Sequence, residues 1–343
     1  MFGSAQSDEH LMQRGSRCVR PVCEACRISP GGYSQGVQEA MADFGAHESF
    51  EHAAQRLSRH YPVSISDTTV RKHTLKAGQK ARATQECHGG VGALPAQGAE
   101  CVEAQADGTM LPLLGFEKAS PSADRRKRRS VHWREQRLCV TRAQGSARAH
   151  YACSMEGVEA LGHAWAHIAK QSGWGLDTQI HVVGDGACWV GEQARQNFGR
   201  HCRVLVDFYH VSEYLAAVAA RHKPADKNWL GRQQSNLKKG RCEKVIKELE
   251  RLEEPQSEPD ELAVARNARR YLGNRRDQLW YDEALRLGRS IGSGLIEGSH
   301  RHVLQQRLKL SGAWWLPENA KAMSHLRVAL ANNTFDELFP LAS

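Results

Sequence analysis

The sequence predicts an α/β protein with a small helical unit ahead of a mixed-sheet domain, which a second helical segment interrupts. Between residues 100 and 220, apolar segments of strand length alternate with segments of helical periodicity. From residue 221 to 288 the periodicity is helical and polar. Three short helical segments precede a Gly-rich stretch near residues 85–100, which is typical of a linker.

The composition is that of a globular protein. Of 343 residues, 41% are hydrophobic and 25% charged, which is enough apolar surface for a real core. No apolar run approaches the ~18 residues that span a bilayer, and the N-terminus lacks the apolar region of a secretory signal. We therefore expect a cytoplasmic protein with no membrane partner, in which most of the ten cysteines are reduced.

Residues 1–32 form a cysteine-containing N-terminal segment. Cys18, Cys23 and Cys26 offer three soft ligands, whereas a structural zinc site usually has four. A zinc ion would need a further ligand, from His10 or elsewhere. The pattern favours a segment without metal over a zinc site.

Residues 33–84 predict a helix-turn-helix domain. Helical periodicity covers roughly 34–44, 47–60 and 66–77. Ser66 is a plausible N-cap of the last helix and Gly78 its stop. Because a short turn precedes this helix and Arg71 and Lys72 lie on it, it suits a recognition helix that binds double-stranded DNA. A three-helix packing unit without DNA contacts is the alternative.

The elements after the linker follow a definite order. We expect a strand over 101–115 that carries Asp107 and turns at Gly108, strands from 131 and 147, a helix over 156–173, a strand ending at Asp185, a helix over 187–197, a strand ending at Asp207 and a helix over 209–221. This is the order of an RNase H-like domain. Its first part would span 100–220, the all-α insertion 221–288, and the final helices, which carry Glu297, 289–335.

Three acids are expected to converge in such a domain. Its first and fourth strands are neighbours, so Asp107 and Asp185 would lie together, and Glu297 would approach from the late helix. Like charges at short range destabilise a fold unless a cation neutralises them. Carboxylates select Mg²⁺ or Mn²⁺, and two such ions about 4 Å apart promote phosphoryl transfer. Taken singly, each acid also suits a turn or a helix cap.

Basic residues suggest where nucleic acid would bind. The segment 124–150 contains nine Lys or Arg but only two acids. Its centre is the run RRKRR, which contains Arg125, Arg126, Arg128 and Arg129. Such a run is either a solvated loop or a phosphate-binding loop. Arg301, one helical turn after Glu297, could reach a phosphate or belong to a solvated face.

Four blocks, ADGTMLP, GDGACWV, VDFYHVSEYL and GSGLIEGSHRHVLQQRLKLSG, resemble bacterial insertion-sequence transposases of the DDE type. The similarity is to the branch related to the eukaryotic Mutator elements (Kra-type insertion sequences), and it covers roughly residues 100 to 333. It implies that Asp107, Asp185 and Glu297 are the catalytic triad and ligands of two Mg²⁺ or Mn²⁺ ions.

The resemblance also bears on DFYH, which matches an Asp/Cys-x2-His signature of this branch. Asp207 and His210 thereby become accessory site residues, with the alternative that Asp207 caps a helix and His210 packs beneath it. Relatives usually begin with a longer cysteine-rich segment, which predicts weakened recognition of element ends and is consistent with an N-terminally truncated copy.

The sequence thus predicts a nucleoid-associated bacterial DNA transposase that cleaves element ends, transfers strands to target DNA and acts as a homodimer or higher oligomer. A stand-alone RNase H-like nuclease would keep the triad without an end-binding domain. A transposase-derived DNA-binding regulator would use the helix-turn-helix alone, and the intact triad argues against it.

Overall fold

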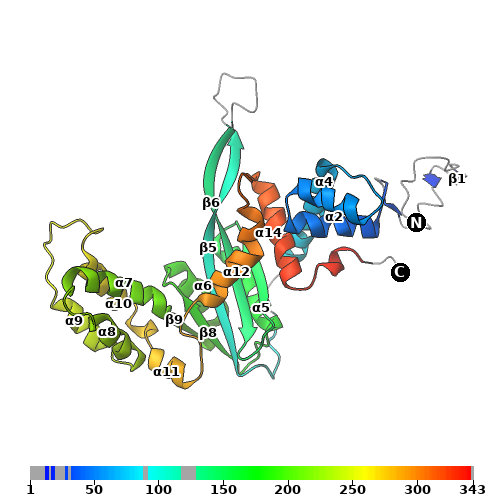
Figure 1. Cartoon of the computed structure of the whole chain (residues 1–343). Coiled ribbons are helices and arrows are strands. Elements are labelled where there is room, and N and C mark those ends of the chain that lie inside the picture. Colours follow the sequence, from blue (N-terminus) through cyan, green and yellow to red (C-terminus); the bar gives the residue numbers. More distant parts are fainter. Residues whose placement is uncertain are drawn as a thin grey trace. The chain divides into compact units, whose positions relative to one another are not determined.

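The computed structural model describes residues 32–87, 92–116 and 129–340, together with the backbone of three short strands near the N-terminus. These strands are β1 (Met12–Arg14), β2 (Arg17–Val19) and β3 (Ile28–Ser29); β1 pairs with β2, and β3 with β4 (Tyr33–Ser34). The chain divides into two compact units (Figure 1). The helical unit comprises 1–88, 110–136 and 300–343, and the sheet unit comprises 89–109 and 137–299.

Three helices open the helical unit, as the sequence predicts. They are α2 (Gln35–His47), α3 (Phe50–His60) and α4 (Asp67–Glu86), and their N-caps are Ser34, Ser49 and Ser66. The Ser66 hydroxyl accepts a hydrogen bond from the amide of Thr69, so the predicted cap is confirmed. Buried Met41, Leu57 and Val70 join the three helices in one core.

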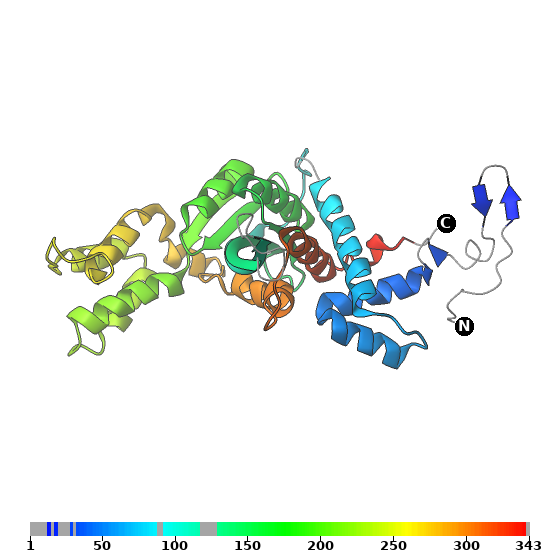
Figure 2. The same ribbon diagram turned by 90° about the horizontal axis from the view of Figure 1, so that it is seen from above.

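The prediction that Gly78 ends the third helix is wrong. Helix α4 continues to Glu86, and Gly78 lies buried inside it. A β-carbon at Gly78 would lie 2.2 Å from the carbonyl oxygen of Ala322 in α14 (Pro317–Ala331). The glycine therefore permits close packing of α4 on α14 (Figure 2) and is not a cap.

Two buried arginines tie the C-terminal part of the helical unit to α2. After a π-helical turn (His300–Gln305) and α13 (Gln306–Leu308), Arg307 donates to the carbonyl of Gly45. Arg327 of α14 donates to the carbonyls of Val303 and Ala46. Burial lowers the pKa of Arg307 to about 10. Both guanidinium groups contact the carbonyl end of α2, where positive charge is favourable. A 3-10 turn (Asp336–Leu338) follows α14.

A five-stranded mixed sheet organises the sheet unit. The strands are β5 (Cys101–Phe116), β6 (Arg129–Ala143), β7 (His150–Ser154), β8 (Gln179–Gly184) and β9 (Cys202–Val206), in the order β7-β6-β5-β8-β9. β6 and β7 are antiparallel, whereas β8 runs parallel to both β5 and β9. The α/β class with a mixed sheet is confirmed, and the first long strand lies beside the fourth as predicted.

Strand β5 does not turn at Gly108, contrary to the sequence prediction. It continues to Phe116 as one long strand (Figure 1). Asp107 therefore lies within β5. Pairing with β8 ends at Gln105, but β6, the neighbour on the other side, is 15 residues long and supports β5 further. A local turn signal was overridden by an adjacent strand.

Helices α5 (Val158–Gln171) and α6 (Cys188–Phe198) cover one face of the sheet. Their Trp165 and Phe198 pack on Val102, Ala104 and Val182. Val183, Leu205 and Val206 belong to a second core with α7 (Phe208–His222) and the insertion.

The insertion, residues 221 to 288, is described throughout and has no strand. It forms α8 (Trp229–Lys238), α9 (Cys242–Glu250), α10 (Val264–Gly273), α11 (Tyr281–Arg286) and a 3-10 turn (Arg276–Gln278). Within the described part of the chain, no helix has both the length and the apolar character that a membrane span requires.

Candidate active site

The three predicted acids lie on one face of the sheet, opposite α5 and α6. Side chains alternate along a strand, and Val102, Ala104 and Ala106 of β5 face α5 and α6. Glu103, Gln105 and Asp107 therefore belong to the other face. There, Glu103 pairs with Arg142 of β6 at 2.8 Å. Asp107 is half-buried, and its carboxylate accepts from the amide of Gly108 at 2.6 Å.

Asp185 occupies the matching position beside β8. The parallel pairing ends with Gln105 opposite Val183, and Asp107 and Asp185 each lie two residues further along the chain. Because the paired segments run in the same direction, both acids lie just beyond the last β5–β8 pair, at the carboxyl end of β8. Asp185 is exposed and directly follows the last residue of β8.

Residues 289–297, here called the crossing segment, bring Glu297 to the same face. Arg289 donates to the side chain of Gln179 at 2.5 Å, and the carbonyl of Ser290 lies 2.7 Å from His181 Nε2. Further on, the amide of Ile296 donates to Gln105 Oε1 at 2.9 Å. The segment thus runs along β8 towards its carboxyl end, where α12 (Gly294–Ser299) begins.

Asp207 has the opposite environment to Asp185. It directly follows β9, is only 2% exposed and caps α7. Its Oδ1 accepts from the amides of Tyr209 at 2.5 Å and His210 at 3.0 Å. Its Oδ2 accepts from the amide of Ser293 at 2.5 Å and from the Ser293 hydroxyl. The capping alternative therefore describes Asp207.

His210, the other accessory candidate, packs on tyrosine rings. Its ring centroid lies 5.5 Å from that of Tyr214 and 5.7 Å from that of Tyr271. Its Nδ1 is 3.5 Å from Glu213 Oε2. His210 thus lies against the helical insertion, through Tyr271.

Two residues of the insertion contact the turn at Asp185 and Gly186, here called the Asp185 turn. Sequence reasoning missed both. The Tyr271 hydroxyl donates to the carbonyl of Asp185, and Arg275 donates to the carbonyl of Gly186 at 2.7 and 3.0 Å. Burial raises the pKa of Tyr271, so this hydroxyl stays a donor. The Arg275 guanidinium also lies 4.2 Å from the Tyr271 ring centroid. The i, i+4 spacing of these residues shows that they can meet, but nothing in it points to Asp185.

The carboxylates of Asp107 and Asp185 suit only an incomplete type of metal site. Within the described ranges, no group of three or more His, Cys, Asp or Glu is arranged to hold an ion. The side chains do not form a complete protein cage. Mg²⁺, however, commonly binds one or two carboxylates, with water and substrate phosphates completing its shell. Asp107 and Asp185, each two residues beyond the last β5–β8 pair, fit that kind of binding.

The predicted DNA-binding residues are distributed over several elements. Arg71 and Lys72 are exposed on α4, Arg129 is exposed at the start of β6, and Arg301 is exposed in the π-helical turn. Arg125, Arg126 and Arg128 lie outside the described residues. Of the predicted zinc ligands, Cys23 and Cys26 also lie outside them, and only the backbone of Cys18 is described.

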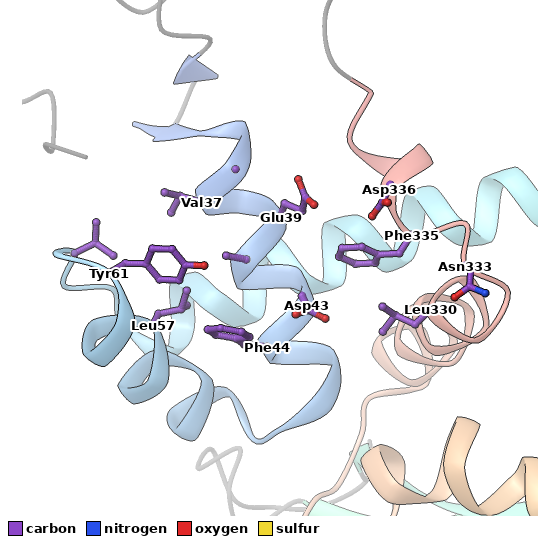
Figure 3. Close-up of a pocket in the computed structure, with 13 residues that line it drawn as sticks. Val37, Glu39, Asp43, Phe44, Leu57, Tyr61, Leu330, Asn333, Phe335 and Asp336 are labelled. Carbon is purple, nitrogen blue, oxygen red and sulfur yellow. The ribbon is translucent and has the colours of Figure 1, made fainter. Parts of the chain in front are cut away.

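A cavity of about 680 Å³ lies in the helical unit and not at the carboxylates (Figure 3). Phe44, Tyr61 and Phe335 line it, together with the acids Glu39, Asp43 and Asp336. Burial and the two neighbouring carboxylates raise the pKa of Glu39. The acids would repel a phosphodiester, so this cavity does not suit DNA.

Comparisons with known proteins give a family and a weak structural likeness. A model described as "Uncharacterised protein family (UPF0236)" matches residues 23–336. The comparison with curated proteins finds no significant match. Among solved structures, the Drosophila P element transposase strand transfer complex is similar over 92% of this chain and 84% of that chain, with 8% identity and a TM-score of 0.33. A TM-score of that size does not establish a common fold.

Proposed function

This chain belongs to the protein family UPF0236, and from the placement of its carboxylates we propose that it is a DDE-type DNA transposase. The observation that supports the proposal most is the pairing of β5 with β8. It sets Asp107 and Asp185 at equivalent positions on neighbouring parallel strands, while the crossing segment brings Glu297 to the same face. The proposal includes an RNase H-like core and places the chain on the Mutator-related branch.

The proposed reaction has two steps. Hydrolysis at an element end breaks a P–O3′ bond and leaves a free 3′-OH. That hydroxyl then attacks a phosphorus of the target, forming a new P–O bond and releasing the target's own 3′-OH. Neither step requires a covalent bond between protein and DNA. Asp107, Asp185 and Glu297 would hold Mg²⁺ or Mn²⁺, two ions in the proposed form, which would supply positive charge to the attacked phosphate.

The protein's own groups would fix where this chemistry occurs. Strands β5 and β8 hold two carboxylates at a set spacing, and the Tyr271 hydroxyl fixes the backbone of the Asp185 turn. Such preorganisation lowers the barrier because no rearrangement accompanies the reaction. Asp207 and His210 would act as supporting residues of this site.

Residues other than the three acids would also bind double-stranded DNA. Helices α3 and α4 would form a helix-turn-helix that reads element ends through Arg71 and Lys72. Arg301 and the basic residues Arg125, Arg126, Arg128 and Arg129 would bind phosphates. Since two element ends must be joined to one target, we propose a homodimer or a higher oligomer.

A strand-transfer assay tests the proposal directly. Labelled duplexes carrying the DNA that flanks the coding region are incubated with a target plasmid and Mg²⁺. We expect ends released with a 3′-OH and then joined to the plasmid, and we expect Glu297→Gln to do neither. Cleavage without joining would instead indicate a nuclease, and specific binding without cleavage would indicate a regulator.

A binding assay tests the recognition helix. Replacing Arg71 and Lys72 with Ala should weaken binding to the flanking repeats more than binding to random DNA, because base contacts carry sequence information and phosphate contacts do not. The control variant removes the same charge at Arg195 and Arg200, which are exposed in the sheet unit. Equal losses on both DNAs would contradict the assignment of α4.

A further inference from the structure

We infer that Ser293 is a positioning residue that fixes the carboxylate of Glu297, with buried Asp207 as its anchor. The inference rests on the proposed function only in taking Glu297 as an active-site acid. It assigns Asp207 no direct contact with substrate or metal.

The anchor is saturated with donors. Three backbone amides, those of Tyr209, His210 and Ser293, donate to the Asp207 carboxylate, and the Ser293 hydroxyl also lies against its Oδ2. A carboxylate has about four lone-pair sites, so this set leaves little capacity for a ligand. Asp207 thus joins the start of α7 to the crossing segment.

Ser293 connects this anchor to the active-site acid. Its hydroxyl lies 2.9 Å from Glu297 Oε1, and its carbonyl accepts from the amide of Glu297 at 3.2 Å. A serine hydroxyl has one hydrogen, so it can donate to only one of the two carboxylates at a time. Asp207 keeps three amide donors in either case. The hydroxyl can therefore orient Glu297 while that carboxylate is unliganded and turn to Asp207 when Glu297 binds a ligand.

Gln105 fixes the same segment from the strand that carries Asp107. Its side chain is fully buried, donates to the carbonyl of Gly292 at 3.3 Å and accepts from the amide of Ile296 at 2.9 Å. These two contacts flank Ser293 in the chain. One buried amide side chain thereby connects the strand that carries Asp107 to the segment that carries Glu297.

The test compares Ser293→Ala with two further variants and a control. Ser293→Thr restores a hydroxyl. Ser293→Cys keeps the size of the side chain but is a weak donor, and it replaces the Ala variant if that variant fails to fold. Ser290→Ala is the matched control, because Ser290 lies in the same segment but its hydroxyl donates to the carbonyl of Gly292 and not to a carboxylate.

Three quantities are measured: Mn²⁺ binding by electron paramagnetic resonance without DNA, the Mg²⁺ concentration for half-maximal cleavage, and amide exchange over residues 290–297. Removing a group that orients a metal ligand typically costs about 10-fold in affinity or activity. We expect Ser293→Ala and Ser293→Cys to weaken Mn²⁺ binding and raise the Mg²⁺ requirement by about that factor, with faster exchange at Ile296 and Glu297. Ser293→Thr and Ser290→Ala should resemble the wild type.

The outcomes separate this inference from the proposed function. A wild type that neither cleaves DNA nor binds Mn²⁺ contradicts the proposed function, and the exchange rates then still show whether Ser293 orders the Glu297 backbone. If the wild type cleaves, and Ser293→Ala keeps its Mn²⁺ affinity, Mg²⁺ requirement and exchange rates, the positioning inference is wrong. Equal changes in Ser290→Ala would also overturn it, because they would show a general loosening of the segment.

Discussion

Asp185 and Asp207 follow neighbouring parallel strands, and the chain uses them in opposite ways. Gly184 of β8 pairs with Val206 of β9, so the two acids continue their strands from equivalent positions. Asp185 is exposed, and its carboxylate accepts a hydrogen bond from the amide of Ala187 at 2.9 Å. Asp207 is buried under Ser293 and accepts hydrogen bonds from three backbone amides, and the Ser293 hydroxyl also lies against it. What packs over an acid at a strand end therefore decides whether it is a buried cap or an exposed carboxylate.

The largest effect should come from Asp185→Asn. The amide keeps an oxygen for the Ala187 amide but loses the charge that would bind a cation, so we expect cleavage to fall about a thousand-fold, equivalent to about 4 kcal/mol. Folding should be unchanged, because Asp185 is exposed and the Asn oxygen can accept the same hydrogen bond. Mg²⁺-dependent release of a labelled DNA end and a melting curve are measured together. Cleavage close to the wild-type rate would remove Asp185 from the proposed site.

Asp207→Asn should have the opposite effect to Asp185→Asn, because it should lower the stability of the fold before it affects cleavage. Its oxygen can still accept from Tyr209 and His210, but its amide nitrogen would face the buried amide of Ser293, donor against donor. We expect a loss of about 2–3 kcal/mol in the free energy of unfolding, since a buried donor loses its charged acceptor. Urea denaturation of both variants checks the contrast. A fully stable Asp207→Asn protein without activity would argue for direct contact between Asp207 and substrate.

Gly186→Ala tests how the Asp185 turn is held. Gly186 has φ +84°, and a β-carbon there would lie 2.6 Å from Arg275 Nε and 2.7 Å from the Tyr271 hydroxyl. Gly199→Ala is the control, because Gly199 has φ +53° and a β-carbon there would have no neighbouring atom within 4 Å. Both variants incur backbone strain of about 1–2 kcal/mol, and Gly186→Ala should lose more stability and also activity. Equal losses would mean that the insertion does not constrain the turn.

Tyr271→Phe should have the smallest effect. It removes the hydroxyl that donates to the carbonyl of Asp185 but keeps the ring stacked on Tyr214, with centroids 4.4 Å apart. We expect about 1 kcal/mol of lost stability. Amide exchange at Gly186 and Ala187 should rise, and it should stay unchanged in Tyr281→Phe, whose hydroxyl is buried in the sheet unit and has no hydrogen-bond partner among the described residues. Unchanged exchange in Tyr271→Phe would show that the Asp185 turn is stable by itself.

Much of the architecture follows from local patterns. Helices α2, α3, α5, α6 and α7, the five strands and the all-helical insertion were predicted near their observed positions, because apolar periodicity and caps are properties of short segments. The errors at Gly78 and Gly108 share one cause. In each case a residue that is permissive for turns lies where a neighbouring element, α14 or β6, packs closely and extends the regular structure.

The sequence by itself determined the α/β class, the order of the elements and the acids that stand at strand ends. Only the tertiary structure decided that Asp207 is saturated while Asp185 is exposed, and that Ser293, Gln105, Tyr271 and Arg275 support the acids. The physical reason is the separation along the sequence of the residues in contact. A cap or an apolar stripe is set by residues a few positions apart, whereas these contacts join residues 86 or more positions apart and exist only once the crossing segment and the insertion are packed on the sheet.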